Sequence, residues 1–515
     1  MIRLYNSLTQ AKEDFVPREE GKAGIYCCGP TVYNLVHIGN ARPYVTFAVL
    51  RSWLRHRGYA VALVENITDV DDKIIAKASA EGRTSAEVAA EYTAAYHDDM
   101  GRLGLELRPD VEPLATETIP EIVDLCRRLV ATGHAYEADG SVYFRVRSFP
   151  EYGKLSRQRI EDLEEGARVE GEPGKEDPLD FAVWKAAKPG EPAWESPWGM
   201  GRPGWHIECS AMGLRYLGAG FDVHGGGRDL IFPHHENEIA QSEAAGLPFA
   251  RIWMHNGMIR SGGEKMAKSV GNIFLLREVL DRYAPPVVLT YFLTTHYRSP
   301  LEFSVDKLDE AKAAYDRLVE AVRTASFRID HPGDGEPLRA DELHAAAAAA
   351  RDGFAAHMDD DLNTAAALGE VFGLARELFR YVAAADAAGA AVDADALEEA
   401  EDAIVAGLDA LLIALPDSVS SARDLRAAKG EQACTTENVA LPPAARLAEE
   451  ARWDDLALLY VERLNCGDAT YACALRDRYR GEKDWASADK VRDAIQAAGF
   501  ELRDTPQGTQ VVPRG

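Results

Sequence analysis

The sequence predicts an α/β fold, in which a parallel sheet precedes an all-helical region and a small C-terminal domain. Three observations indicate this class. Short apolar runs alternate with helix-forming segments at the start of the chain, as strands and crossover helices do in parallel sheets. From about residue 306 to 415, apolar residues recur at helical spacing in sequence rich in Ala, Leu, Glu and Asp. The length of 515 residues is enough for about three or four domains.

The first half of the sheet can be followed element by element. Residues 23–28 form an apolar run that predicts a buried strand, which ends at Gly29-Pro30 because these residues favour a turn. The expected continuation is a helix at 39–57, a strand at 59–67 and a helix at 69–82. The sheet is expected to resume near Gly201, with a later strand at 221–224. Strand, helix and strand of this length are typical of a Rossmann-like parallel sheet.

Between about 112 and 200 the pattern changes, and Pro, Gly and charged residues dominate 163–178. We expect a connective insertion between two halves of the sheet. In the helical region, Pro332 and Pro337 lie close together and predict a loop between helices of a bundle. The remaining predicted parts are a linker at 416–444 and a C-terminal unit at 445–515, with a helix at about 484–498 that ends at Gly499 and a strand-like tail.

Composition restricts the class of protein. The net charge of −27 argues against a general nucleic-acid binder, although a folded chain can still gather basic residues locally. The seven cysteines form no short regular framework, and an odd number favours reduced thiols in the cytosol. The N-terminal residues enter globular sequence at once, and no run of about 18 apolar residues exists. We therefore expect a cytoplasmic protein without a signal peptide or a membrane span.

A candidate metal site lies in the second half of the predicted sheet domain. His234 and Glu238 are four residues apart, so on a helix they lie on one face. Cys209 precedes His234 by 25 residues, and a further thiol would complete a soft set of ligands. Cys27 and Cys28 are neighbours on the predicted strand, where their side chains point to opposite faces, so only one of them can take part. Thiolate, imidazole and carboxylate together suit Zn²⁺, whereas each residue alone would more often be structural.

Three segments have the character of nucleotide-binding motifs. His37-Ile38-Gly39-Asn40 comes where a loop enters a helix, and a helix N-terminus offers N–H groups to phosphate. In Lys265-Met266-Ala267-Lys268-Ser269, two lysines three residues apart can converge on a transferring phosphate. His224-Gly225-Gly226-Gly227-Arg228-Asp229 follows a strand, where glycines can admit a base or ribose and a carboxylate can bind ribose hydroxyls. Taken singly, each segment also has a structural explanation: a helix cap, a solvated basic loop or a turn.

Together these motifs resemble the cysteinyl-tRNA synthetase family of class I aminoacyl-tRNA synthetases, over nearly the whole chain. The strongest segments are Tyr26–Tyr33, Asn66–Lys73, Gly204–Ser210, His224–Glu238 and the Lys265 loop. The resemblance implies a zinc enzyme that ligates L-cysteine to its tRNA through cysteinyl-adenylate, uses ATP with Mg²⁺, and acts as a monomer. It assigns the zinc ligands to Cys28, Cys209, His234 and Glu238, which resolves the choice between the two adjacent cysteines.

The resemblance also implies roles for single residues and domains. For the phosphates these are His37, Asn40, Lys265 and Lys268, and for ATP as a whole Gly39, His224, Gly226, Asp229 and again Lys268. Thr68 and Trp205 would line the amino-acid pocket, and Arg480, Trp485, Asp489 and Asp504 would bind the anticodon. The implied domains are a catalytic domain at 1–305 with a stem-contact region at about 262–305, a helical tRNA-binding bundle at 306–415 and an anticodon-binding domain at 445–515. Asn40 and Ala267 stand where many class I enzymes have His and Ser, and we expect activity to survive both changes.

Two other functions share parts of this pattern. A ligase of the mycothiol type, which joins activated cysteine to an amino sugar, would have the same zinc and ATP residues. Its small acceptor would need neither the long helical region nor the anticodon-like tail. A non-catalytic tRNA-binding paralogue is expected to have lost signature residues, whereas here both lysines, His37 and all four metal positions remain.

Overall fold

The computed structural model describes residues 1–161, 174–261, 264–265, 274–417, 419–420, 492, 500–505 and 508–513. The chain separates into two compact units, one formed by 1–318 and 334–414 and the other by 319–333 and 415–515. Among the described residues, no helix is both long and apolar enough to cross a bilayer.

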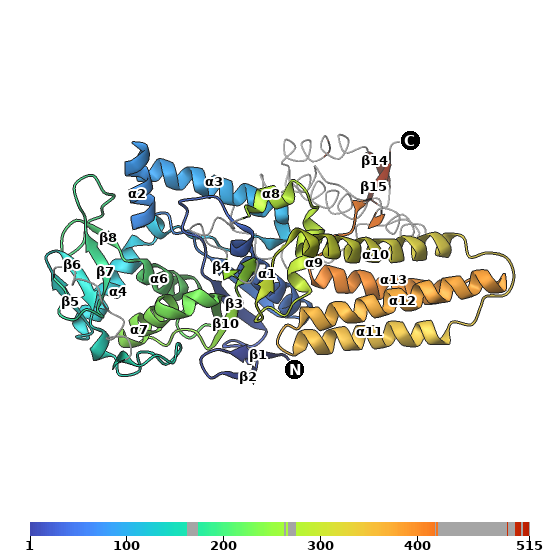
Figure 1. Cartoon of the computed structure of the whole chain (residues 1–515), viewed down its shortest axis with the longest axis horizontal. Helices are drawn as coiled ribbons and strands as arrows, with labels where there is room; N and C mark the ends of the chain where they lie inside the picture. The colour runs from blue at the N-terminus through green and yellow to red at the C-terminus, as the bar shows by residue number, and fades with distance from the viewer. Residues whose placement is uncertain are drawn as a thin grey trace. The chain divides into compact units, whose positions relative to one another are not determined.

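The core of the first unit is a four-stranded parallel sheet with the strand order β10-β9-β3-β4 (Figure 1). Its strands are β3 (Lys22–Cys27), β4 (Ala60–Glu65), β9 (Val223–Gly227) and β10 (Ile252–Asn256). α1 (Ile38–His56) connects β3 to β4, as the predicted strand–helix–strand unit required. The predicted fold class is confirmed, because a parallel α/β sheet is followed by a helical region.

β3 and β4 form strands because their sequences are apolar at most positions. Ile25, Tyr26 and Cys27 of β3 are buried, and so are Leu63 and Val64 of β4. Near-continuous apolar runs are typical of parallel strands that are covered on both faces. β3, a central strand, and β4, an edge strand, are therefore both buried within the unit.

The strand order places a topological switch point between β3 and β9. The chain passes from β3 to β4 on one side of the sheet and from β9 to β10 on the other, so the connections after β3 and β9 diverge. Open α/β sheets bind ligands at the carboxyl ends of their strands at such a point. The N–H of Cys28 donates to the carbonyl oxygen of Gly225, with 3.0 Å between N and O, which joins the two strand ends.

An antiparallel sheet occupies the predicted insertion and extends past its predicted end at about residue 200, because its last strand begins at Gly201. Its strands, in sheet order, are β5 (Ala135–Ala138), β6 (Ser141–Phe144), β7 (Phe181–Ala186) and β8 (Gly201–Pro203). α4 (Ile119–Ala131) packs against this sheet and against α6 (Trp205–Leu217). Val142, Phe144 and Trp184 are fully buried in the core between them. The insertion therefore has a hydrophobic core of its own beside the parallel sheet.

Residues 1–302 contain further elements outside these two sheets. They are β1 (Arg3–Asn6), β2 (Ala11–Asp14), α2 (Asp72–Glu81), α3 (Ser85–Leu103), η1 (Leu105–Leu107), η2 (Ala115–Glu117), η3 (Val146–Ser148), η4 (Arg228–Leu230), η5 (Ile231–His235), α7 (Glu236–Ala244), β11 (Ile259–Ser261), β12 (Glu264–Lys265), α8 (Leu276–Leu280), α9 (Pro285–Leu293) and β13 (Leu301–Glu302). β1 pairs with β2, and β11 lies between β12 and β13. α2 begins later than predicted because Asp71 caps it: its carboxylate accepts a bond from the N–H of Lys73.

The helical region contains a bundle whose members pack against one another (Figure 1). They are α11 (Asp341–Asp359), α12 (Thr364–Ala388) and α13 (Ala394–Ala410). The long α10 (Val305–Asp330) precedes them in the chain. Pro332 and Pro337 lie in the connection from α10 to α11, as predicted from their position.

The described C-terminal residues form a hairpin. β14 (Phe500–Thr505) pairs antiparallel with β15 (Gly508–Pro513), so the strand-like tail predicted there consists of two strands. The predicted linker at 416–444 and the predicted helix at 484–498 lie almost entirely outside the described residues.

Candidate active site

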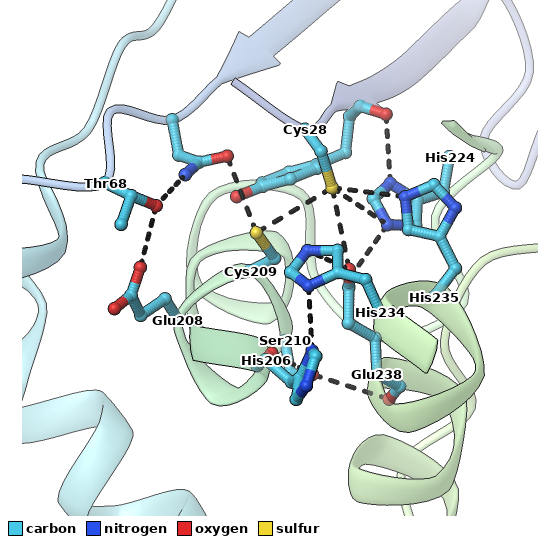
Figure 2. Close-up of polar contacts among 12 residues, drawn as sticks. Cys28, Thr68, His206, Glu208, Cys209, Ser210, His224, His234, His235 and Glu238 are labelled. Atoms are coloured by element: carbon cyan, nitrogen blue, oxygen red, sulfur yellow. Dashed lines mark hydrogen bonds and ion pairs between the residues drawn. The ribbon is translucent and has the colours of Figure 1, made fainter. Parts of the chain in front are cut away.

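A buried cluster of sulfur, nitrogen and oxygen donors lies at the carboxyl ends of β3 and β9 (Figure 2). Cys28 is the first residue after β3, and its Sγ atom belongs to the cluster. Cys27 is the last residue of β3 and is buried as well. Alternation along a strand predicted that only one of the two takes part, and among the described residues Cys28 is the one that does.

The four residues predicted as metal ligands lie close together and are all buried. One donor atom from each of Cys28, Cys209, His234 and Glu238 lies within 4.8 Å of the other three. The Sγ atom of Cys28 is 3.8 Å from the Sγ atom of Cys209 and 3.5 Å from Oε1 of Glu238. The Nε2 atom of His234 is 2.9 Å from the same carboxylate oxygen. Two thiols, an imidazole and a carboxylate form a donor set that suits Zn²⁺.

Three helical segments carry the ligands that follow the insertion. Cys209 is on α6, and Glu238 is in the first turn of α7. His234 is in η5, directly before α7, where the extended backbone of Phe232 kinks the helical path. The cluster therefore joins the end of β3 to helices that are distant from it in the sequence.

A second set of donors overlaps the first and shares Cys28 and Glu238 with it. Its other members are His224, on β9, and His235. The Nε2 atom of His224 is 2.8 Å from Oε2 of Glu238, and the Nε2 atom of His235 is 3.3 Å from the Sγ atom of Cys28. His224 was predicted to bind ATP, and in the structure its other ring nitrogen, Nδ1, bonds the carbonyl oxygen of Tyr26.

Further histidines extend the cluster, and the sequence analysis assigned no role to them. The Nδ1 atoms of His206 and His234 are 2.8 Å apart, and Nδ1 of His235 is 2.7 Å from Nε2 of His255. His255 in turn contacts the hydroxyl of Ser7 at 2.9 Å. Burial lowers the pKa of His206 and His235 well below the usual value and lowers the pKa of His255 to about 3, so these rings are neutral near pH 7. His206 lies in the segment Gly204–Ser210, and His235 lies in the segment His224–Glu238. Their positions beside predicted site residues were the signal by which the sequence could have identified them.

The cluster stabilises two anions near neutral pH. A hydrogen bond from Cys28 and the nearby His234 outweigh burial and lower the pKa of Cys209 to about 6. Burial by itself raises the pKa of Glu238, but His224 and His234 outweigh it and hold that pKa well below the usual range. Burial opposes the charge of His234, but Glu238 and Cys209 raise its pKa to about 10. The Cys209 thiolate and the Glu238 carboxylate are forms that bind a metal, whereas burial raises the pKa of Cys28, so Cys28 and His234 would lose a proton on metal binding.

A chain of hydrogen bonds beside the cluster fixes Thr68. The Nδ2 atom of Asn66 donates to the Thr68 hydroxyl at 3.2 Å, and the hydroxyl donates to Oε2 of Glu208 at 2.8 Å (Figure 2). The side-chain oxygen of Asn66 accepts a bond from the N–H of Gly29 at 3.0 Å and lies 3.5 Å from the Sγ atom of Cys209. Thr68 was predicted to line an amino-acid pocket, and these bonds hold it next to the predicted metal ligands. Asn66 and Glu208 were not predicted as site residues.

Trp205, the other residue predicted for that pocket, is the first residue of α6. Its ring centre is 4.3 Å from that of His234, so the indole packs directly on a predicted metal ligand. Trp205 is only half-buried, whereas His234 is buried. The indole therefore lies at the margin of the cluster.

The predicted phosphate-binding segment forms the start of α1. His37 caps the helix, and its N–H donates to the side-chain oxygen of Asn40 at 3.2 Å. A Cβ atom on Gly39 would come within 2.9 Å of Nδ1 of His37, so a larger residue would displace this imidazole from its place over the first turn. The histidine ring is thereby held at the N-terminal end of α1.

The other predicted ATP residues are only partly described. A Cβ atom on Gly226 would lie 3.7 Å from Cβ of Cys28, so this glycine adjoins the cluster. Asp229 is exposed in η4. Lys265 pairs with Arg260 as part of β12, its side chain is not described, and Lys268 lies outside the described residues.

Of the predicted anticodon residues, Asp504 alone lies within the described part of the chain. Asp504 lies in β14 opposite Thr509, and its side chain is not described. Arg480, Trp485 and Asp489 lie outside the described residues.

Comparison with known proteins identifies the class to which this fold and site belong. Residues 14–313 match the sequence profile of the family described as tRNA synthetases class I (C) catalytic domain. Residues 353–408 match the profile described as the DALR domain. The chain thus has the catalytic domain and the DALR domain of a class I tRNA synthetase.

Full-length relatives narrow the class to a family. The chain is 45% identical to a cysteine–tRNA ligase from Pelotomaculum thermopropionicum, with 100% of both chains covered. It is 46% identical to a cysteine–tRNA ligase from Nitratidesulfovibrio vulgaris, with 98% of this chain and 99% of the relative covered. The chain belongs to the cysteine–tRNA ligase family and is therefore an enzyme, as its motifs predicted.

Solved structures of lower identity share the fold. A Mycobacterium tuberculosis methionyl-tRNA synthetase in complex with methionyl-adenylate aligns with a TM-score of 0.58 at 16% identity, over 78% of this chain and 93% of that one. A leucyl-tRNA synthetase complex from Agrobacterium radiobacter aligns with a TM-score of 0.58 at 12% identity, over 82% of this chain and 86% of that one. At these identities the likeness concerns the fold alone.

Proposed function

We propose that this enzyme activates L-cysteine with ATP as cysteinyl-adenylate and transfers it to its tRNA, with a metal-bound thiolate selecting the amino acid. The observation that carries the proposal is the buried cluster of two thiols, an imidazole and a carboxylate at the switch point of the sheet. A site that must recognise a thiol needs thiophilic chemistry, and a hydrophobic pocket alone separates close isosteres poorly.

The donor set fits Zn²⁺, and Cys28, Cys209, His234 and Glu238 would hold it. When bound, Zn²⁺ would supply a Lewis acid that favours a thiolate over the much less acidic hydroxyl of serine. Two thiolates and one carboxylate already exceed the charge of the ion. A third thiolate is therefore accommodated best if one ligand can loosen. Glu238 is the candidate, because both of its oxygens also have histidine partners, His234 and His224.

The residues around the cluster would orient the rest of the amino acid. Thr68 and Trp205 would line its pocket. The hydroxyl of Thr68 is held between Asn66 and Glu208, so its direction is set before substrate binds. In the activation step a carboxylate oxygen of cysteine forms a bond to the α-phosphorus of ATP. The bond from that phosphorus to the bridging oxygen breaks, and pyrophosphate leaves with the electron pair.

The chain would promote this step by positioning and by charge rather than with a nucleophile of its own. His37, Asn40, Lys265 and Lys268 would contact the phosphates, with Mg²⁺ on the nucleotide. Gly39, His224, Gly226 and Asp229 would form the rest of the ATP site. Support comes from His37 and Asn40, which lie together at the N-terminal end of α1, where a helix favours phosphate.

In the second step the 2′-hydroxyl of the terminal ribose attacks the carbonyl carbon of the adenylate. The ester bond forms, the bond to the phosphate oxygen breaks, and AMP leaves. We assign tRNA binding to the bundle at 306–415 and anticodon binding to 445–515, where Arg480, Trp485, Asp489 and Asp504 are the candidates. Stacking on Trp and hydrogen bonds from Arg and Asp are the usual means of recognising unpaired bases. The catalytic domain would span 1–305, and the protein would act as a monomer in the cytoplasm.

Amino-acid-dependent exchange of pyrophosphate with ATP tests this proposal. It should be measured with cysteine and with serine, before and after removal of zinc, and followed by charging of cysteine tRNA. We expect zinc-dependent exchange with cysteine, little with serine, and charging. Exchange without charging would favour a ligase with a small acceptor. No exchange in folded, zinc-loaded protein would reject the proposed mechanism.

A further inference from the structure

Lys73 lies at the margin of the candidate site, where two aromatic rings position its ammonium group but no described carboxylate neutralises it. Lys73 is exposed in the first turn of α2. Its Nζ atom is 5.4 Å from the ring centre of Tyr33 and 5.8 Å from that of Trp205. At these distances the ring faces attract the ammonium group and position it. Among the described residues no carboxylate forms an ion pair with it.

The nearest charged neighbours of Lys73 are satisfied by other groups. Asp72 pairs with Lys185 of β7 at 2.5 Å and also with Arg202 of β8. The carboxylate of Asp71 accepts a bond from the backbone N–H of Lys73 rather than from its ammonium group. The charge of Lys73 is therefore available to an external anion.

Tyr33, Lys73 and Trp205, which we call the rim cluster, lie at the margin of the predicted metal ligands. Both aromatic rings are half-buried, and Lys73 is exposed, whereas the neighbouring His234 is buried. Trp205 connects the exposed ammonium group of Lys73 with the buried cluster, because its ring packs on His234 as well as on that ammonium group. A ligand of the rim cluster would thus approach from solvent and end beside the metal ligands.

Two aromatic rings with an uncompensated ammonium group match the chemistry of single-stranded RNA. Its bases stack on aromatic side chains, and its phosphates pair with cations. The amino-acid carboxylate fits less well, because in the proposed reaction it must face the α-phosphate of ATP beside His37. We propose that Lys73 binds a phosphate of the single-stranded 3′ end of the tRNA and guides that end toward the amino acid. This inference rests on the proposed function, since it requires tRNA as acceptor.

A binding cycle tests the proposal without depending on catalysis. Lys73→Met keeps most of the aliphatic side chain and removes the charge, and Lys73→Arg keeps the charge. Lys77→Met is a matched control one turn later on α2, because Lys77 also lies over a ring, that of Tyr92 at 4.6 Å, but is neutralised by Glu81 at 3.3 Å. Each full-length enzyme would be titrated with intact cysteine tRNA and with the same tRNA trimmed of its single-stranded 3′ end.

We expect Lys73→Met to weaken binding of the intact tRNA by about tenfold, as for loss of a hydrogen bond to a charged group. Binding of the trimmed tRNA should be unchanged, and Lys73→Arg and Lys77→Met should behave as the original protein. The slope of log affinity against log salt for intact tRNA should fall by about 0.7, the value for one phosphate of a single strand.

Equal weakening for both tRNAs, or no weakening, would overturn the proposal. So would unchanged tRNA binding together with a raised KM for cysteine in pyrophosphate exchange, because the ammonium group would then serve the amino-acid carboxylate. Failure of the proposed function would look different. The original protein would lack cysteine-dependent exchange, while the binding cycle would still decide whether Lys73 contacts the 3′ end.

Discussion

At the scale of single residues, Glu238 is the point where the two overlapping donor sets meet. One of its oxygens contacts His234 and the Sγ atom of Cys28, and the other contacts His224. A carboxylate with partners on both oxygens can give up a contact at one oxygen and keep the contact at the other. Glu238 is therefore suited to be the ligand that makes room for a substrate thiolate.

Replacing Glu238 with Gln should raise the KM for cysteine in pyrophosphate exchange by about tenfold or more. The amide keeps the shape but removes a negative ligand, and changes around metal ligands commonly cost 10- to 100-fold in affinity or activity. Zinc content would be measured on the same samples. The matched control is Glu243→Gln on the same helix, whose carboxylate pairs with Lys154 instead. Unchanged kinetics in the Glu238 variant would contradict the adaptable role.

Glu65 shows how a buried carboxyl group can make stability depend on pH. It is 1% exposed at the end of β4, and burial and the nearby Glu112 raise its pKa well above the usual value, offset only in part by Arg51 and Tyr96. The folded state then holds a proton that the unfolded state releases above about pH 4.3. Stability from this group is thus fully present below that pH and is lost as pH rises toward the folded pKa.

Glu65→Gln should remove this loss, because the amide does not ionise. The melting temperature of the variant should match the original near pH 4.5 and exceed it by about 2 °C or more at pH 8. Thermal unfolding across this range would measure the difference. Glu310→Gln, at a side chain that is 64% exposed, should show no such trend. A difference that is constant with pH would mean that Glu65 stays ionised in the fold.

At the scale of elements, α7 ties the insertion to the candidate site. Its first residue, Glu236, is fully buried, and its carboxylate accepts bonds from the backbone N–H groups of Gly153, Leu155 and Ser156. The nitrogen-to-oxygen distances are 2.9, 3.1 and 2.7 Å. Glu238, a predicted metal ligand, is two residues further along α7. The loop at 153–156 therefore also fixes the helix that carries this ligand.

We expect Glu236→Gln to destabilise this junction. The amide nitrogen would face backbone donors, and a buried donor without a partner costs about 1–3 kcal/mol. Amide hydrogen exchange should accelerate at residues 153–156 more than in α11–α13, and the melting temperature should fall. Glu151→Gln, in the same loop but 65% exposed, provides the comparison. Equal protection in both variants would show that other contacts hold the loop.

The sequence predicted the elements that depend on residues close together in the chain. β3, α1 and β4 follow from apolar runs, a turn and a helix start, and alternation along β3 left only one of Cys27 and Cys28 for the metal. The antiparallel sheet of the insertion was missed, because its short strands are separated by Pro, Gly and charged residues. His255 was missed for another reason: it meets His235 only through the pairing of β9 with β10 and the turn η5. Contacts that depend on register between distant segments leave no local pattern.

At the scale of the whole molecule, the predicted metal would act as a cross-link. Cys28 follows the first strand of the sheet, and Cys209, His234 and Glu238 come only after the insertion. The fold has other bonds in the same place, including Glu238 to His224 and Cys28 to Gly225. Removal of the metal should therefore weaken the first unit without unfolding it.

Chelation should lower the melting temperature of the protein by several degrees, and Zn²⁺ should restore it. A ligand bound at 1,000 times its Kd stabilises the folded state by about 4.1 kcal/mol, and this contribution is lost on removal. Cysteine-dependent exchange should be lost and regained in parallel. Cys209→Ser should be insensitive to the chelator, since a serine hydroxyl is a poor zinc ligand. Cys126→Ala, which changes a buried thiol in the core of the insertion, should respond like the original protein. If the chelator lowered the melting temperature of Cys209→Ser as much as that of Cys126→Ala, the metal would lie elsewhere in the chain, and the buried cluster would be a hydrogen-bonded network rather than a zinc site.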